Sequence, residues 1–340
     1  MSEIKFYFAP MEGVTGYTLR NVHHACYPGM DAYFTPFIVP NQHHAVNPKE
    51  HRDVVQTNNV GVPIIPQILT NKAELFLWSA RELKENYGYN EVNLNLGCPS
   101  KTVVSKHKGS GFLEDTEKLD KFFDEVFSAV EAASSASKPG EADCIYPRIS
   151  VKTRLGLESV EEFADILQVY NKYPLSELII HARVQQEFYK GVPHLSAFGD
   201  AVKETQHSLC YNGDIWTLKD YKLVKELFPS VKKFMIGRPL MANPELVMEC
   251  QAYESCLEEG KEWTGYPNST KTLKQFHDKL LQGYLDQMNG DGNNVLFKMK
   301  ELWCFMGRQF PEEGRLVQKM IKSKKIEEYE RLAEQLFAEV

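Results

Sequence analysis

The chain has 340 residues, a formal net charge of −7, and the composition of an ordinary globular protein, with 43% hydrophobic and 25% charged residues. No run of about 18 apolar residues occurs, and the first residues, MSEIKFYFAPME, lack the pattern of a signal peptide, so we expect a cytoplasmic protein without a membrane span. The seven cysteines show neither CxxC pairs nor Cys/His ligand spacing, which argues against a disulfide framework and against a metal site.

Short runs of β-branched and aromatic residues recur along the first 245 residues, each bounded by turn-forming residues. Amphipathic helical segments separate most of these runs, and Ser159 and Thr217 are the expected N-caps of two such helices. Eight strand–helix repeats in about 245 residues match the count and size of a (β/α)8 TIM barrel. A doubly wound sheet is the alternative, but the phosphate-loop and GxGxxG signatures that often accompany it are missing. The expected strands are residues 5–11, 32–39, 63–69, 91–99, 148–155, 177–183, 208–215 and 234–240.

Strand signals cease after about residue 245, and the rest of the chain is typical of helices. The expected helices are residues 268–288 and 294–310 and a short one at 331–337, after a linker near residue 263. We therefore expect a TIM-barrel catalytic domain over residues 1–245 and a small all-helical C-terminal domain over residues 260–340.

Polar residues stand at the C-terminal ends of nearly all the expected strands, where TIM barrels carry their functional groups. Burying so many polar groups at one mouth without a ligand would be costly, so the sequence predicts a binding site there. The glycines and the arginine of the last two strands suit a phosphate, and Lys152 on the opposite side suits a negatively charged ring atom. From these residues alone, flavin mononucleotide and a sugar phosphate fit nearly equally well. The strand-end residues are Pro10, Met11, Glu12, Gln67, Asn95, Cys98, Lys152, Arg154, His181, Arg183, Asn212, Gly213, Asp214, Gly237 and Arg238.

Seven segments around these residues resemble the signature segments of bacterial tRNA-dihydrouridine synthases: APMEGVTG, the strand that holds Gln67, NLNLGCPS, SVKTRLG, IIHAR, YNGDI and MIGRPLMANP, in this order. The resemblance extends from about residue 8 to residue 245, and the helical tail has the size of that family's tRNA-binding domain. It implies an FMN-dependent oxidoreductase that takes electrons from NADPH and reduces the 5,6 double bond of selected uridines in tRNA.

The resemblance also implies a role for each matching residue. Cys98 would be the general acid, and Asn95 and Arg183 would bind the uracil or its nucleotide. A thiol with an ordinary pKa near about 8.5 is mostly protonated at neutral pH and can donate a proton to C5 of uracil. Lysines close to Cys98 would favour the thiolate, so we expect Lys101, Lys106 and Lys108 to point toward solvent or RNA. FMN would be held by Pro10, Met11, Gln67, Lys152, His181, Asn212, Gly213, Asp214, Gly237 and Arg238.

Two other functions stay open on the residues alone. One is an FMN barrel that reduces a free pyrimidine or an enone, and the other is a non-catalytic tRNA-binding module. Residues 246–340 hold 13 basic and 16 acidic residues, so the tail has no overall positive charge with which to attract tRNA. A monomer is the default expectation.

Overall fold

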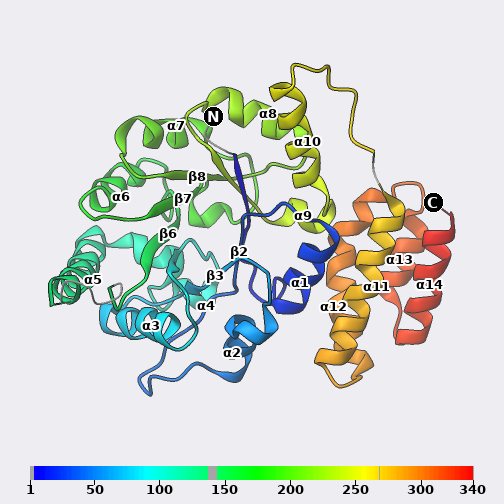
Figure 1. Ribbon diagram of the computed structural model, residues 1–340, viewed down its shortest axis with the longest axis horizontal. Helices are drawn as coiled ribbons and strands as arrows, with labels where there is room; N and C mark the ends of the chain where they lie inside the picture. Colours follow the sequence, from blue (N-terminus) through cyan, green and yellow to red (C-terminus); the bar gives the residue numbers. More distant parts are fainter. Residues whose placement is uncertain (1–3, 137–143, 268, 340) are drawn as a thin grey trace.

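The centre of the molecule is a ring of parallel strands surrounded by helices, and a second group of helices packs against one side of it (Figure 1). The computed structural model describes residues 4–136, 144–267 and 269–339. Every neighbouring pair of strands is parallel, in the order β3-β2-β1-β9-β8-β7-β6-β5-β4. The strands are β1 (Lys5–Phe8), β2 (Ala32–Phe34), β3 (Ile64–Ile65), β4 (Gln67–Ile68), β5 (Glu91–Leu96), β6 (Arg148–Arg154), β7 (Glu177–His181), β8 (Leu209–Asn212) and β9 (Lys233–Ile236).

The third expected strand is divided in two at Pro66. β3 pairs with β2 and β4 pairs with β5, so the two ends of the strand order flank this proline. Proline has no N–H and therefore donates no ladder hydrogen bond, but the Pro66 carbonyl accepts one from Asn93 N–H at 2.9 Å. The ring closes through Pro66, and the predicted TIM barrel with its eight strands is confirmed.

The barrel is filled by side chains. Tyr7, Phe34, Ile179, Cys210 and Met235 belong to one buried cluster formed by residues of the strands. A far larger cluster joins the outer faces of the strands to the surrounding helices and continues into the C-terminal helices. The interior is therefore a packed core, and open space begins only at the carboxyl ends of the strands.

The helices of the barrel follow the strands along the chain. Thr217 caps α8 as predicted, because its Oγ1 accepts from Asp220 N–H at 3.3 Å while the Asp220 carboxylate accepts from Thr217 N–H at 2.9 Å. The predicted cap at Ser159 is wrong, because α6 begins at Glu162, whose carboxylate accepts the Ser159 N–H at 2.7 Å. The helices are α1 (Tyr17–Cys26), α2 (Pro48–Val54), α3 (Ala73–Glu85), α4 (Lys101–Val104), α5 (Thr116–Ala136), α6 (Glu162–Tyr170), α7 (Leu195–Glu204), α8 (Leu218–Leu227), α9 (Arg238–Ala242) and α10 (Leu246–Glu258), with 3-10 turns η1 (Gln56–Asn58), η2 (Gly109–Glu114) and η3 (Gln185–Glu187).

α10 packs on the barrel, since Tyr221 Oη of α8 donates to Glu254 Oε1 at 2.9 Å. We therefore place α10 with the barrel, and the expected boundary at residue 245 falls just before it. None of the helices in the described parts of the chain has the length and apolar character needed to cross a membrane.

The C-terminal helices form a bundle beside the barrel, which we call the helical unit (Figure 1). α11 lies along α1, where the Phe276 ring meets the rings of His23 and Tyr27 edge-on and Thr18 Oγ1 donates to Gln287 Oε1 at 2.6 Å. The sequence did not predict α13 as a separate helix. The unit consists of α11 (Thr270–Gln287), α12 (Gly292–Met306), η4 (Gly307–Gln309), α13 (Gly314–Lys322) and α14 (Ile326–Glu339).

Candidate active site

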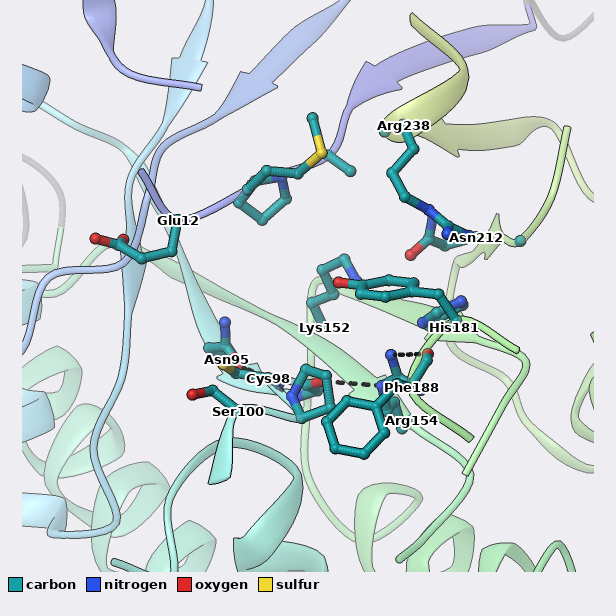
Figure 2. Close-up of a pocket in the computed structure, with 18 of the residues that line it drawn as sticks. Glu12, Asn95, Cys98, Ser100, Lys152, Arg154, His181, Phe188, Asn212 and Arg238 are labelled. Carbon is teal, nitrogen blue, oxygen red and sulfur yellow. Dashed lines mark hydrogen bonds between the residues drawn. The ribbon is translucent and has the colours of Figure 1, made fainter. Parts of the chain in front are cut away.

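A pocket of about 410 Å³ opens at the carboxyl ends of the strands (Figure 2). Every residue predicted for the site except Arg183 lines it. Glu12 and Arg154, which also stand at strand ends, belong to the lining as well. The lining residues are Ala9, Pro10, Met11, Glu12, Phe37, Gln67, Asn95, Gly97, Cys98, Pro99, Ser100, Lys152, Arg154, His181, Phe188, Tyr189, Asn212, Gly213, Asp214, Gly237, Arg238, Pro239 and Phe305.

Cys98 sits on a turn that is held from both sides. Asn95 Oδ1 accepts the N–H groups of Gly97 at 3.1 Å and Cys98 at 2.9 Å. The Cys98 carbonyl accepts the Ser110 N–H at 3.2 Å and the Ser110 hydroxyl at 2.8 Å. Gly109 has a φ of +57°, and a Cβ there would lie 2.8 Å from the Cys98 carbonyl oxygen, so this approach requires glycine.

The Cys98 thiol is kept in its protonated form. Burial raises its pKa above the ordinary value, and this effect outweighs the Ser100 N–H and the nearby Arg154 and Lys152 charges, which lower the pKa. Lys101 and Lys106 of the following loop are exposed as expected, whereas Lys108 is partly buried, and none of the three is among the groups that act on the thiol. The arrangement suits an acid that gives up a proton at neutral pH.

A chain of side-chain hydrogen bonds runs from the Cys98 turn down into the barrel. Asn95 Nδ2 donates to Gln67 Oε1 at 2.6 Å, and Gln67 Nε2 donates to Asn93 Oδ1 at 2.8 Å. Asn93 Nδ2 then donates to Ser150 Oγ at 3.0 Å, and this hydroxyl donates to the carbonyl of Val92 at 3.2 Å. Because every member is buried and paired, the chain holds the Asn95 amide in one orientation.

Lys152 reaches into the middle of the pocket from β6 (Figure 2). Burial, and then the charge of Arg154, lowers the pKa of its ammonium to about 7. Within the described residues, no carboxylate and no hydrogen-bond acceptor pairs with this ammonium. A half-buried cation without a partner in its own protein is suited to an anionic ligand group.

Arg183 lies behind the pocket wall and is fully buried. Its guanidinium donates to both oxygens of Asp214, one of them at 3.1 Å, and to the carbonyls of Lys190 and Gly191 at 3.0 and 2.8 Å. It also donates to His181 Nε2 at 3.3 Å, so the hydrogen of the neutral His181 ring is on Nδ1. Burial lowers the pKa of His181 well below its ordinary value, which keeps the ring neutral. The structure thus places Arg183 as a support for His181 and Asp214 rather than at the pocket surface.

Arg154 joins the Cys98 turn to the loop that follows β7. Its guanidinium donates to the carbonyls of Gly97 at 3.0 Å, Val184 at 2.9 Å and Phe188 at 2.7 Å. No carboxylate pairs with it in the described residues, and burial lowers its pKa to about 10. Its positive charge therefore adds to that of Lys152 on the side of the pocket that holds Cys98.

Aromatic and arginine side chains form the remaining rim. The Arg238 guanidinium lies 4.2 Å from the centre of the Tyr189 ring and 5.6 Å from that of Trp216, and Arg308 of the helical unit lies 4.5 Å from the Trp216 ring. Phe305, on α12, lines the pocket itself. The helical unit therefore contributes directly to the site.

The aromatic residues of the lining were not predicted from the sequence. Phe188 and Tyr189 come five and six residues after the IIHAR segment, in the loop that follows β7, and this position after a strand was a usable signal. Phe37 has the same signal, because it follows β2 by three residues, whereas Phe305 has none, because it lies on a helix with an ordinary apolar pattern.

The sequence model of the family described as dihydrouridine synthase matches residues 7–337. The tRNA-dihydrouridine(16) synthase of Aquipseudomonas alcaligenes is 27% identical over 249 residues, which are 72% of this chain and 74% of that protein. The tRNA-dihydrouridine(16) synthase of Pseudomonas putida is 26% identical over 312 residues, covering 89% and 88% of the two chains.

Among solved structures, DHODH from Eimeria tenella, in complex with ferulenol, matches with a TM-score of 0.52 at 14% identity and covers 75% of this chain and 82% of that one, a likeness of fold alone. The family match extends over the barrel, the pocket residues and the helical unit. The chain therefore belongs to the dihydrouridine synthase family, as its motifs led us to expect, and is an oxidoreductase of that family.

Proposed function

We propose that this protein is an FMN-dependent, NADPH-oxidising tRNA-dihydrouridine synthase in which Cys98 is the general acid. The observation that carries the proposal is the meeting of two groups in one pocket: a partly buried thiol whose pKa is raised and a lysine ammonium without a protein partner in the described residues. The relatives named as tRNA-dihydrouridine synthases support the substrate class.

The residues present fit a flavin mononucleotide. Lys152 offers its unpaired ammonium to a negatively charged ring edge, and neutral His181 offers its Nδ1–H. Arg238, Gly213 and Gly237 would hold the phosphate, with Asp214 orienting Arg238 through a 3.1 Å contact. The other cofactor contacts we propose are Pro10, Met11, Gln67 and Asn212, all in the pocket lining.

When bound, the reduced flavin supplies the hydride that adds to C6 of uracil. Cys98 Sγ–H supplies the proton that C5 takes up, so the base gains two hydrogens across its 5,6 bond. The thiolate left behind is stabilised by the Ser100 N–H, Arg154 and Lys152, all of which lower the pKa of Cys98. It then regains a proton from solvent.

Asn95 and Arg183, the two predicted substrate-binding residues, have more specific roles in this proposal. Asn95 positions the general acid, because its Oδ1 holds the Gly97 and Cys98 N–H groups. Its place in the pocket lining also leaves it able to contact the uracil. Arg183 acts through its neighbours, since it holds His181 and Asp214 and does not reach the pocket surface.

A uridine inside folded tRNA must leave its stack to enter this pocket, which costs about a few kcal/mol. We propose that the helical unit grips the tRNA, while the barrel carries the chemistry. Lys298 and Lys300 are engaged inside the protein with the carbonyls of Gly13 and Ser323, so they are not free to bind phosphates. The exposed lysines of α13 and the turn after it, Lys319, Lys322, Lys324 and Lys325, are better placed to do so. We further propose that the enzyme works as a monomer in the cytoplasm, where its tRNA substrate would be.

The test is position-by-position mapping of dihydrouridine in tRNA from a strain lacking this protein, with either the wild-type or the Cys98→Ala copy restored. We expect dihydrouridine to disappear from one position and to return only with the wild-type copy. Purified protein should carry FMN and oxidise NADPH in the presence of unmodified tRNA. Reduction of free uracil by the purified protein, with tRNA left unmodified, would replace the proposal with the free-pyrimidine reductase.

A further inference from the structure

Phe188 stands where the active-site pocket meets a second, shallower groove. The groove runs between α4 and η3, and Phe188 is the residue that the two linings share. In Figure 2 it lies toward the Cys98 and Ser100 end of the pocket, away from Arg238. The groove is lined by Lys101, Val104, Ser105, Gln185, Gln186 and Phe188.

The Phe188 ring is partly exposed and has no stacking partner. It belongs to neither hydrophobic cluster, and no aromatic ring or cation lies on it in the described residues. The next residue differs, because the Tyr189 ring already has the Arg238 and Arg154 guanidinium groups 4.2 and 5.5 Å from its centre. Phe188 therefore presents an apolar ring face that the protein itself does not use.

The backbone at Phe188 is in a conformation that favours glycine. Its φ is +52° and its ψ is −94°, which a bulky L-residue rarely adopts. Two hydrogen bonds hold it there: its N–H donates to Gln185 O at 3.0 Å, and its carbonyl accepts from Arg154 Nη2 at 2.7 Å. Phenylalanine at such a position costs backbone free energy relative to glycine, which is consistent with a use of the ring in binding.

The groove suits a nucleotide. Its lining contains the exposed Lys101 and no carboxylate, and Val104 with Phe188 gives it an apolar surface. It begins where the pocket for the target base ends, so an RNA strand entering the pocket has its neighbouring nucleotide at this groove. An aromatic face beside a lysine is the usual combination for stacking a base and contacting its phosphate.

We propose that Phe188 is a stacking platform for the base next to the target uridine, with the phosphate of that nucleotide near Lys101. The inference rests on the proposed function and adds to it a second RNA subsite, occupied by an unpaired flanking base. The platform fixes the strand beside the pocket while the uridine is turned out of its stack.

The test begins with Phe188→Gly, which removes the ring and retains a residue suited to the positive φ. With holoenzyme, NADPH and an unmodified tRNA transcript, we expect kcat/KM to fall about ten- to a hundredfold, the range expected for one stacked base. FMN content and reduction by NADPH alone should not change, and Phe188→Tyr should retain wild-type kcat/KM. Asn289→Gly is the matched control, because Asn289 has the same φ of +52° in the turn between α11 and α12 and lines none of the described pockets.

The second arm uses tRNAs with an abasic residue immediately 5′ or 3′ of the target uridine. One of the two should slow the wild-type enzyme by the factor seen with Phe188→Gly, and it should slow the Phe188→Gly variant no further. Losses that multiply, or loss of FMN from Phe188→Gly, would overturn the platform. If the wild-type protein forms no dihydrouridine in any tRNA, the proposed function itself fails. If dihydrouridine forms at the same rate with and without the Phe188 ring, only the stacking platform fails.

Discussion

The cost of holding Lys152 in the pocket can be measured directly. Its pKa falls from the ordinary 10.5 to about 7 because of burial, and at about 1.36 kcal/mol per pKa unit this corresponds to roughly 5 kcal/mol. The side chain retains partial exposure, so water relieves part of this cost, and we expect a measurable effect of about 1–3 kcal/mol. Lys152→Met keeps the shape of the side chain and removes the charge. The flavin-free variant should therefore be more stable than flavin-free wild type near neutral pH.

The sign of the pH dependence follows from the lowered pKa. Below about pH 7 the lysine is charged in both the folded and unfolded states, and the folded state bears the full cost. Between about pH 7 and the ordinary value of 10.5, the unfolded state binds more protons, so the stability of the wild type rises with pH. The advantage of Lys152→Met should therefore shrink across this window.

The assay is urea unfolding of flavin-free wild type and Lys152→Met at about pH 6.5 and about pH 9.5. Lys219→Met, which changes an exposed lysine on α8, is the control for a general effect of replacing lysine by methionine. The variant should also bind FMN more weakly. A variant less stable than wild type at the lower pH, or an advantage that does not vary with pH, would refute the reasoning.

Three further predictions concern the neighbouring groups. Cys98→Ala should keep FMN and its reduction by NADPH but lower single-turnover reduction of tRNA by about 10²- to 10⁴-fold, and loss of FMN instead would contradict the placement of Cys98. Because burial raises the pKa of Cys98, the single-turnover rate of the wild type should decline with rising pH only above the pKa of an ordinary thiol. A rate that already declines below that pKa would show that burial does not keep the thiol protonated. Asp214→Ala should lower the free energy of unfolding by about 3–5 kcal/mol, because it leaves the buried Arg183 charge unpaired, whereas Asp214→Asn, which keeps an acceptor oxygen, should cost less; equal losses in urea unfolding would point to packing rather than charge.

Most of the barrel could be predicted because each strand is a compact run of β-branched and aromatic residues with polar residues at its end. Those strand ends also predicted the pocket, since parallel strands in a barrel bring their carboxyl ends to one mouth. The proline at residue 66 was a usable signal for the division of the third strand, because it has no N–H. The start of α6 was not predictable in the same way, because it depends on the Glu162 carboxylate accepting the N–H groups of Leu157, Glu158 and Ser159.

The part of the site that escaped prediction comes from long-range contacts. Arg183 stands at a strand end like its neighbours, but Asp214 and the loop carbonyls take up its guanidinium from behind. Phe305 reaches the pocket only because α12 packs beside α9, which depends on how the whole helical unit docks. Spacing along the chain contains no record of either arrangement.

The contribution of Phe305 and Arg308 has a consequence for how this enzyme can be rebuilt. The wall of the pocket is assembled from two parts of the chain, so the tail cannot be exchanged for that of a relative as an independent cassette. A chimera with a different tail would lack Phe305 in the pocket wall. It would also lack Arg308, so that Arg238 would be the one remaining cation of the two that now lie over the Trp216 ring. Changing the target uridine of this enzyme would therefore require replacing the interface residues of both parts together with the tail.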